Sequence, residues 1–278
     1  MSDPPRSMTK MEEAKELHRK VVKKFQKRRI ITKGIDDIWA ADLLIMNQYS
    51  TRNKGYNYIF NVIDTFSKFL FAVPLKKKSG EEVAVAFSKI LKTSNRCPTK
   101  LHVDRGKEFV NKEFQTVLKE NKIEMYHTFN EEKSAIAERV NRTINEKLKL
   151  HFEVTQKFRW IDALEGIVKE YNENDVHRSI GTTPVSVTSK NENEVREKLF
   201  PLNDFHSEKP TFTVGQPVRI PTWKNLFGNK YRRNWTKEIF YISKICYTDP
   251  ITYEIKDNQD EPIHGHFYKQ ELQKTNNT

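Results

Sequence analysis

The chain has 278 residues, which is enough for two domains or for one large domain with an appendage. Its 49 Lys and Arg residues exceed its 37 Asp and Glu residues by 12, which favours a polyanionic partner such as nucleic acid, although an anionic membrane surface also fits. No apolar run approaches the roughly 18 residues of a membrane span, and no hydrophobic signal core is present, so we expect an intracellular protein that neither spans a membrane nor is secreted. Two cysteines, Cys97 and Cys246, exclude a disulfide framework and any zinc finger that needs two local thiolates.

The positive charge lies mainly at the two ends of the chain. Residues 1–35 carry 11 basic and 4 acidic side chains, residues 205–278 carry 11 and 8, and the middle is nearly neutral. Apolar residues at helical spacing predict a helix from Met8 to Phe25. The basic run that follows has two interpretations, a solvated helix end or a set of phosphate contacts, and comprises Lys23, Lys24, Lys27, Arg28 and Arg29.

The elements from residue 38 onward predict a mixed sheet covered by helices. Residues 38–46 form an apolar run of strand length, and residues 56–75 supply two more strands, so the first three strands should form an antiparallel meander. Ser79 and Glu82 form a capping-box pattern at the start of an amphipathic helix. Short strands at 100–103 and 123–128 alternate with helices at 111–121, from 134 past 150, and at 160–172. After Pro201, short strands separated by Gly, Pro and Asn-Asp turns predict a small all-β domain.

Three acidic residues occupy positions where acids are rare. Asp42 interrupts the apolar strand, Asp104 ends another strand before a glycine turn, and Glu138 lies near the start of a helix. An acid in a strand core is costly unless a cation or a hydrogen bond compensates it. Taken singly, each acid is better explained by a salt bridge or a cap, but acids on neighbouring strands and the covering helix together indicate a metal site. Asp64 is a rival carboxylate, interpreted as structural rather than as a direct ligand.

Four stretches resemble the catalytic core of retroviral-type integrases, and more closely the integrases of Maverick/Polinton DNA transposons. They are Gly34-Ile-Asp-Asp-Ile-Trp-Ala-Ala-Asp42, Asn61-Val-Ile-Asp-Thr-Phe-Ser-Lys68, His102-Val-Asp104-Arg-Gly-Lys-Glu-Phe109 and Glu138-Arg-Val-Asn-Arg-Thr143. Further similar stretches begin at Tyr171, Asn234 and His266, so the resemblance spans roughly residues 17–274. The spacing of 33 residues between Asp104 and Glu138 is slightly shorter than in retroviral relatives.

The resemblance implies a fold and a domain order. We expect an α/β, ribonuclease-H-like mixed five-stranded sheet with helices on both faces, followed by a small all-β SH3-like barrel. The domains would be a basic helical N-terminal arm at 1–35, the integrase catalytic core at 36–185, a linker at 186–210 and the barrel at 211–278. The region before Trp39 contains one histidine, His18, and no cysteine, so a zinc-binding N-terminal domain is not expected.

The resemblance also implies the chemistry. Asp42, Asp104 and Glu138 would be the Asp-Asp-Glu catalytic triad that holds two Mg²⁺ ions, with Mn²⁺ as a possible substitute. The expected enzyme is a polynucleotidyl transferase with endonuclease activity, which processes 3′ ends and transfers the strands of element DNA into target DNA. The partners would be double-stranded DNA at both element ends and target, and further copies of the chain in a dimer or tetramer, in the nucleus or at the site of element DNA replication.

Further DNA contacts are expected outside the triad. Asn141, Arg142 and Asn145 follow Glu138 on one helix face, which can equally be an ordinary solvated face. Arg232 and Arg233 stand beside Tyr231 and Trp235, a combination suited to DNA or to a barrel core. Two alternatives to an active integrase stay open: a domesticated integrase-derived DNA-binding protein without integration activity, and a ribonuclease H acting on RNA–DNA hybrids.

Overall fold

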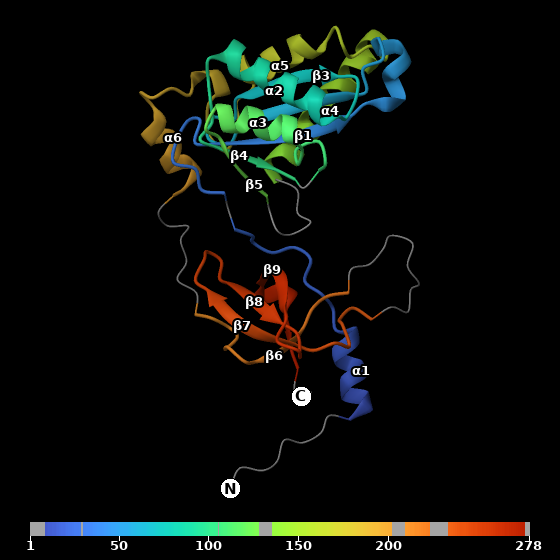
Figure 1. Ribbon diagram of the computed structural model, residues 1–278, viewed down its shortest axis with the longest axis vertical. Helices are drawn as coiled ribbons and strands as arrows, with labels where there is room; N and C mark the ends of the chain where they lie inside the picture. The colour runs from blue at the N-terminus through green and yellow to red at the C-terminus, as the bar shows by residue number, and fades with distance from the viewer. Residues whose placement is uncertain are drawn as a thin grey trace. The chain divides into compact units, whose positions relative to one another are not determined.

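The structure, a computed structural model, describes residues 9–28, 30–104, 106–127, 135–201, 209–222 and 233–275. The chain divides into two compact units: a core unit, Ile31–Leu202, and a second unit that combines Met1–Ile30 with Asn203–Thr278 (Figure 1). None of the described helices is long and apolar enough to cross a membrane.

The core unit is built on a five-stranded mixed sheet. Its strands are β1 (Ile38–Ile45), β2 (Tyr58–Asp64), β3 (Leu70–Leu75), β4 (Lys100–Val103) and β5 (Glu124–His127). Their order is β3-β2-β1-β4-β5, with antiparallel pairing among the first three and parallel pairing of β4 to both β1 and β5. The predicted meander and mixed sheet are therefore confirmed, and β1 is the strand at which the direction of pairing changes.

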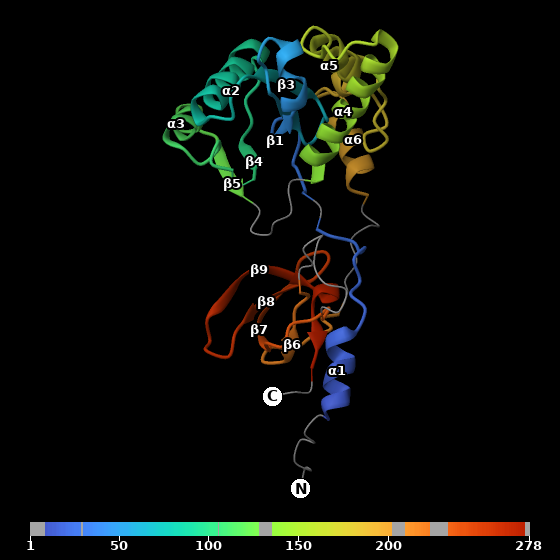
Figure 2. The ribbon, with the colours of Figure 1, turned by 90° about the vertical axis from the view of Figure 1, so that its right-hand side faces the viewer.

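Helices cover both faces of this sheet, as Figure 2 shows. On one face lie α2 (Gly80–Ser94) and α3 (Lys112–Glu120), whose Phe87 and Phe114 enter one core. On the other face lie α4 (Ala135–Thr155) and α5 (Leu164–Glu173), whose Ile144 and Leu164 enter a second core. The sheet can bury both faces because β1 alternates between them: Trp39 packs into the first core and Ala40 into the second.

The core unit continues beyond residue 185, where the sequence predicts a linker. The 3₁₀ helices η1 (Asn47–Asn53) and η2 (Pro184–Ser186) and the helix α6 (Glu192–Leu199) also belong to this unit. Val195 of α6 is buried in a small cluster with Phe66 and Ile180. Val195 and Leu199 are the two apolar residues of this short helix that pack inward, which is too weak a pattern to distinguish this segment from a linker in the sequence.

The second unit contains an antiparallel five-stranded sheet of order β10-β6-β7-β8-β9. Its elements are β6 (Pro217–Arg219), β7 (Phe240–Cys246), β8 (Thr252–Lys256), β9 (Pro262–Tyr268), η4 (Lys269–Glu271) and β10 (Gln273–Lys274). The predicted all-β character is confirmed. The two edge strands, β9 and β10, do not pair with each other in the described residues, so a closed barrel is not confirmed.

The N-terminal helix α1 (Lys10–His18) belongs to the second unit and is shorter than predicted. It begins at a capping box formed by Thr9 and Glu12. Its end is fixed by tertiary contacts, because the backbone carbonyl of Leu17 accepts from the backbone N–H of Trp235, and that of Arg19 accepts from the Trp235 indole at 2.9 Å. The backbone of the C-cap residue Arg19, at φ −56° and ψ 140°, is no longer helical, so the helix does not continue to Phe25.

The same helix supplies a charge to a buried arginine. Arg219 of β6 is 0% exposed, and its guanidinium lies 3.4 Å from the Glu16 carboxylate and donates to the carbonyls of Thr236 and Lys237. A fully buried guanidinium needs this set of acceptors. The N-terminal segment is thus part of the packing of the second unit.

Candidate active site

Asp42 lies on the α4 face of the core sheet. Along β1, Trp39, Ala41 and Leu43 belong to the core beneath α2 and α3, whereas Ala40 belongs to the core beneath α4. Because side chains alternate along a strand, Asp42 shares the face of Ala40. It is half-buried.

Hydrogen bonds fix the orientation of the Asp42 carboxylate. Its Oδ1 accepts from the backbone N–H of Leu43 at 2.8 Å, and its Oδ2 accepts from Nδ2 of Asn141 at 2.8 Å. Asn141 is held in turn, because its Oδ1 accepts from Nδ2 of the buried Asn61 at 2.7 Å. Asn61 stands opposite Asp42 in the β1–β2 register, so a strand and a helix together position the carboxylate.

Asp104 lies at the same level of the sheet as Asp42. In the parallel β1–β4 pair, Ala40 is opposite His102, and both acids follow two residues later. The turn after β4 is tight: the backbone N–H of Gly106 donates to Oδ1 of Asp104 at 3.0 Å. A Cβ at Gly106 would stand 2.4 Å from Oε1 of Glu108, so a larger residue here would require the Glu108 side chain to shift.

Glu138 lies in the first turn of α4, three residues before Asn141, and its side chain is exposed. The helix that holds Asp42 through Asn141 therefore also carries the third predicted acid. The carboxylate oxygens of Asp42, Asp104 and Glu138 do not all lie within 4.8 Å of one another in the described structure. The structure thus brings the predicted acids to one end of one sheet face, without closing them into a compact cluster.

Two charged residues near the triad were not identified from the sequence. Nζ of Lys78 lies 2.7 Å from Oε1 of Glu108, which is 5% exposed. The pKa of Lys78 is raised, first by this hydrogen bond and further by the charges of Glu108, Asp104 and Asp42, against the opposing effect of burial. Lys78 is therefore a cation within the field of two triad carboxylates. The nearest sequence signal was the acid Glu108 directly before the buried Phe109.

The rival carboxylate, Asp64, is occupied by structural contacts. It is 0% exposed, lies 2.8 Å from the Arg96 guanidinium and accepts from the Ser67 hydroxyl at 2.5 Å and from the backbone N–H of Phe66 at 3.1 Å. Burial raises its pKa, and the Ser67 hydrogen bond and the Arg96 charge oppose that rise. These contacts support a structural role in the turn after β2.

The predicted DNA contacts outside the triad have varied surroundings. Lys23, Lys24, Lys27 and Arg28 are exposed in the segment after α1, and Arg233 is also exposed. Arg142 is exposed and paired with Glu146 at 2.9 Å, and Asn145 is half-buried. Arg29 and Arg232 lie outside the described residues. The structure turns the Asn141 amide toward Asp42, and the roles of all these residues in DNA binding stay predictions.

Part of the core unit is similar to integrases and to transposon-derived proteins. Residues 34–130 match the integrase core domain family, a range that contains Asp42 and Asp104 and ends before Glu138. The chain is 34% identical over 197 residues to a putative transposon-derived protein of Caenorhabditis elegans, covering 70% of this chain and 65% of that protein. It is 24% identical over 239 residues to the retrovirus-related Pol polyprotein from transposon 297 of Drosophila melanogaster, covering 83% of this chain and 21% of the polyprotein.

Among solved structures, the fold is similar to a chain of the simian T-cell lymphotropic virus intasome, solved in complex with the PP2A regulatory subunit B56 gamma. The TM-score is 0.64 at 15% identity, covering 94% of this chain and 86% of that chain. At this identity the likeness concerns the fold. The core unit thus contains a segment similar to the integrase core domain family, it has the fold of the retroviral intasome chain, and its sequence relatives are transposon-derived.

Proposed function

We propose that the chain is a DNA integrase or transposase of the Maverick/Polinton type, which processes the 3′ ends of element DNA and joins them to target DNA. The observation that carries the proposal is the placement of the acids. Asp42 on β1 and Asp104 directly after the parallel neighbour β4 lie at the same level of the sheet. The Asp42 carboxylate is held by a hydrogen bond from Asn141, on the helix that also carries Glu138. Similarity to transposon-derived proteins supports the same conclusion.

The donor set suits hard divalent cations. Asp42, Asp104 and Glu138 offer only carboxylate oxygens, which Mg²⁺ and Mn²⁺ accept together with water and phosphate. In this proposal Asp42 would contact both ions, and Asp104 and Glu138 would hold one each. Two such cations stabilise the attacking and the leaving oxygen of a phosphoryl transfer. Asn141 and the Leu43 N–H orient the Asp42 carboxylate, while the ammonium of Lys78 reduces repulsion between the acids.

The assembly would need both units of the chain. We assign the exposed lysines after α1 to phosphate contacts with double-stranded DNA, and the C-terminal sheet, as an SH3-like module, to target DNA or to multimer contacts. The nucleus or the site of element DNA replication is the expected location. The basic excess of residues 1–35 supports the DNA assignment. The intasome of the structural relative motivates a dimer or tetramer of this chain on paired DNA ends.

A strand-transfer assay with terminal-repeat DNA, with and without Mg²⁺, tests the proposal. Asp42→Asn, Asp104→Asn and Glu138→Gln should each reduce end processing and strand transfer together, by about 10³-fold or more, because both steps share one metal site. DNA binding should survive. The matched control is Glu146→Gln, two turns after Glu138 on the same helix and also exposed.

Two results would contradict this assignment. Full activity in any of the three triad variants would remove that residue from the site. A wild-type protein that binds terminal-repeat DNA tightly but transfers no strand with either cation would favour the domesticated DNA-binding protein instead.

A further inference from the structure

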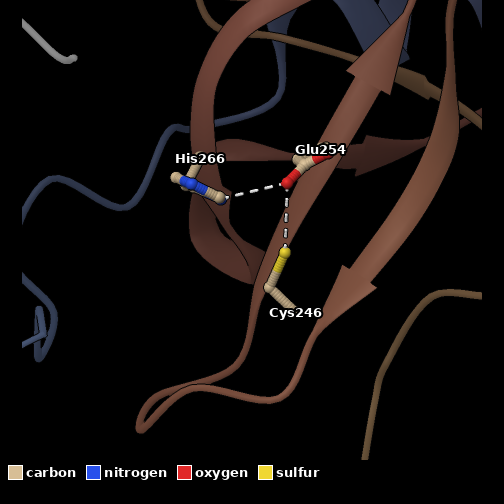
Figure 3. A group of neighbouring side chains, drawn as sticks. All are labelled: Cys246, Glu254 and His266. Carbon is tan, nitrogen blue, oxygen red and sulfur yellow. Dashed lines mark hydrogen bonds and ion pairs between the residues drawn. The ribbon is translucent and has the colours of Figure 1, made fainter.

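Three potential metal ligands meet on neighbouring strands of the C-terminal sheet, within the second unit. Cys246 comes from β7, Glu254 from β8 and His266 from β9, and Figure 3 shows their side chains directed toward one another. Their donor atoms all lie within 4.8 Å of one another, the only such trio among the described residues. None of the three belongs to the proposed active site.

The strand register explains the meeting. Lys244 pairs with Glu254, and Cys246 pairs with Thr252, so Cys246 and Glu254 lie diagonally on one face of β7 and β8. Tyr253 pairs with Phe267, and the neighbouring residues Glu254 and His266 lie where the register of β8 and β9 shifts. The opposite face of β8 is turned to the core through Tyr253 and Ile255. The trio is therefore placed by the sheet rather than by mobile chain ends.

The distances approach those of a zinc site. Sγ of Cys246 lies 3.5 Å from Oε1 of Glu254, and Nδ1 of His266 lies 3.9 Å from the same oxygen. With ordinary zinc bond lengths, tetrahedral geometry separates a thiolate sulfur from a carboxylate oxygen by about 3.5 Å, and that oxygen from an imidazole nitrogen by about 3.3 Å. The first distance needs no change, and the second needs a small rotation of an imidazole.

Burial and nearby charges shift the pKa values of His266 and Cys246. Burial, and then the charge of Arg28, lower the pKa of His266, while the Glu254 charge acts against that change. Burial and the Glu254 carboxylate raise the pKa of the Cys246 thiol, while Lys244 and Arg28 act against that rise. Nζ of Lys244 lies 3.8 Å from the Glu254 carboxylate, but its side chain is 66% exposed and can turn into solvent.

We propose that Cys246, Glu254 and His266 form a zinc-binding site with its fourth position open to water. A mixed sulfur, nitrogen and oxygen donor set suits Zn²⁺ and the chemically similar Co²⁺, whereas Mg²⁺ requires oxygen ligands. One ion would link the three strands β7, β8 and β9. The site is independent of the two cations proposed for the triad.

A Co²⁺ titration of the metal-depleted full-length chain tests the site. A thiolate ligand gives a sulfur-to-cobalt charge-transfer band that the carboxylates of the triad cannot produce, so the two sites are distinguished. We expect this band to saturate at one equivalent, to disappear when Zn²⁺ displaces Co²⁺, and to be lost in Cys246→Ser. His266→Gln and Glu254→Gln should weaken Co²⁺ binding by at least about 100-fold. This exceeds the usual effect of removing a residue that only hydrogen-bonds to a metal ligand.

The chain offers matched controls. Cys97→Ser removes the other cysteine, which is exposed in the core unit, and His264→Gln changes an exposed histidine two residues from His266. Both variants should keep the band, and Zn²⁺ should raise the melting temperature of the wild type but not of Cys246→Ser. The proposal is overturned if the wild type gives no band, if Cys246→Ser keeps it, or if Cys97→Ser loses it. Should Cys246→Ser fail to fold, Glu254→Gln decides by the same titration.

Discussion

Asn141→Ala tests whether the hydrogen bond from α4 to β1 positions the first metal ligand. In the structure the Asn141 amide donates to Oδ2 of Asp42 at 2.8 Å and accepts from Asn61 at 2.7 Å. A hydrogen bond to a charged group contributes about 1.5–3 kcal/mol, which corresponds to roughly 10- to 150-fold. Loss of a side chain that orients a metal ligand typically costs about 10–100-fold. We therefore expect the Mg²⁺ concentration for half-maximal strand transfer to rise by about 10–100-fold.

The assay separates positioning from DNA contact. Strand transfer is measured over a Mg²⁺ series, and DNA affinity is measured separately by fluorescence anisotropy at fixed salt. A positioning residue changes the Mg²⁺ dependence and leaves DNA affinity unchanged, whereas a DNA contact does the reverse. Thr143→Ala is the control, because it lies on the same helix and its hydroxyl donates to the helix carbonyl of Arg139.

Stability must be followed in the same variant. Asn141→Ala leaves the side-chain amide of the buried Asn61 without its acceptor, at a cost of about 1–3 kcal/mol to the free energy of unfolding. Urea unfolding shows whether the protein is still folded under assay conditions. A folded Asn141→Ala protein with wild-type Mg²⁺ dependence would refute the reasoning.

Three further predictions follow from burial and charge. Burial lowers the pKa of Lys68 from 10.5 to about 8, so on raising the pH the folded protein loses this proton before the unfolded chain does. Urea unfolding should therefore show that the free energy of unfolding of the wild type, relative to that of Lys68→Met, rises between pH 8 and 10.5 by at most about 3 kcal/mol. Glu16→Ala should lower the free energy of unfolding of the second unit by about 2 kcal/mol, because the buried Arg219 loses a charged partner; an unchanged melting curve would contradict this. Reversing the charge of Lys23 and Lys24 to Glu should flatten the log–log salt dependence of DNA binding by about 0.9 for each lysine that binds a phosphate in the wild type, and an unchanged slope would indicate a solvated segment.

The core sheet was predictable because its strands carry local patterns. The apolar run of β1 and its single acid, Asp42, indicated a strand with a functional interruption, and the structure places that run in the centre of the sheet. Ser79 was identified as a helix cap, and its side chain accepts from the backbone N–H of Glu82. A capping box would also have the Glu82 carboxylate accept from the backbone N–H of Ser79. The carboxylate instead accepts from the backbone N–H groups of Lys76 and Lys77. Local spacing indicated the cap but not the competing donors.

The remaining features depend on contacts between distant residues. The end of α1 is set by Asn234 and Trp235, more than 200 positions away, so no helix-end signal near Phe25 could reveal it. Lys78 and Glu108 meet near the triad from segments 30 residues apart. Cys246 and His266 are brought together by the pairing register of β7, β8 and β9, and a shift of one residue would move a side chain to the other face.

The change of pairing direction at β1 is what makes the proposed site possible. Because β1 is antiparallel to β2 but parallel to β4, the carboxyl-terminal ends of β1 and β4 point in the same direction. In α/β sheets, ligands bind outside such carboxyl ends. Asp42 lies in the second half of β1, Asp104 directly follows β4, and α4 covers the same face with Asn141 against Asp42. Because β2 runs antiparallel to β1, its last residue, Asp64, is paired with Trp39 near the start of β1. Asp64 therefore contacts Arg96 and does not lie beside Asp104.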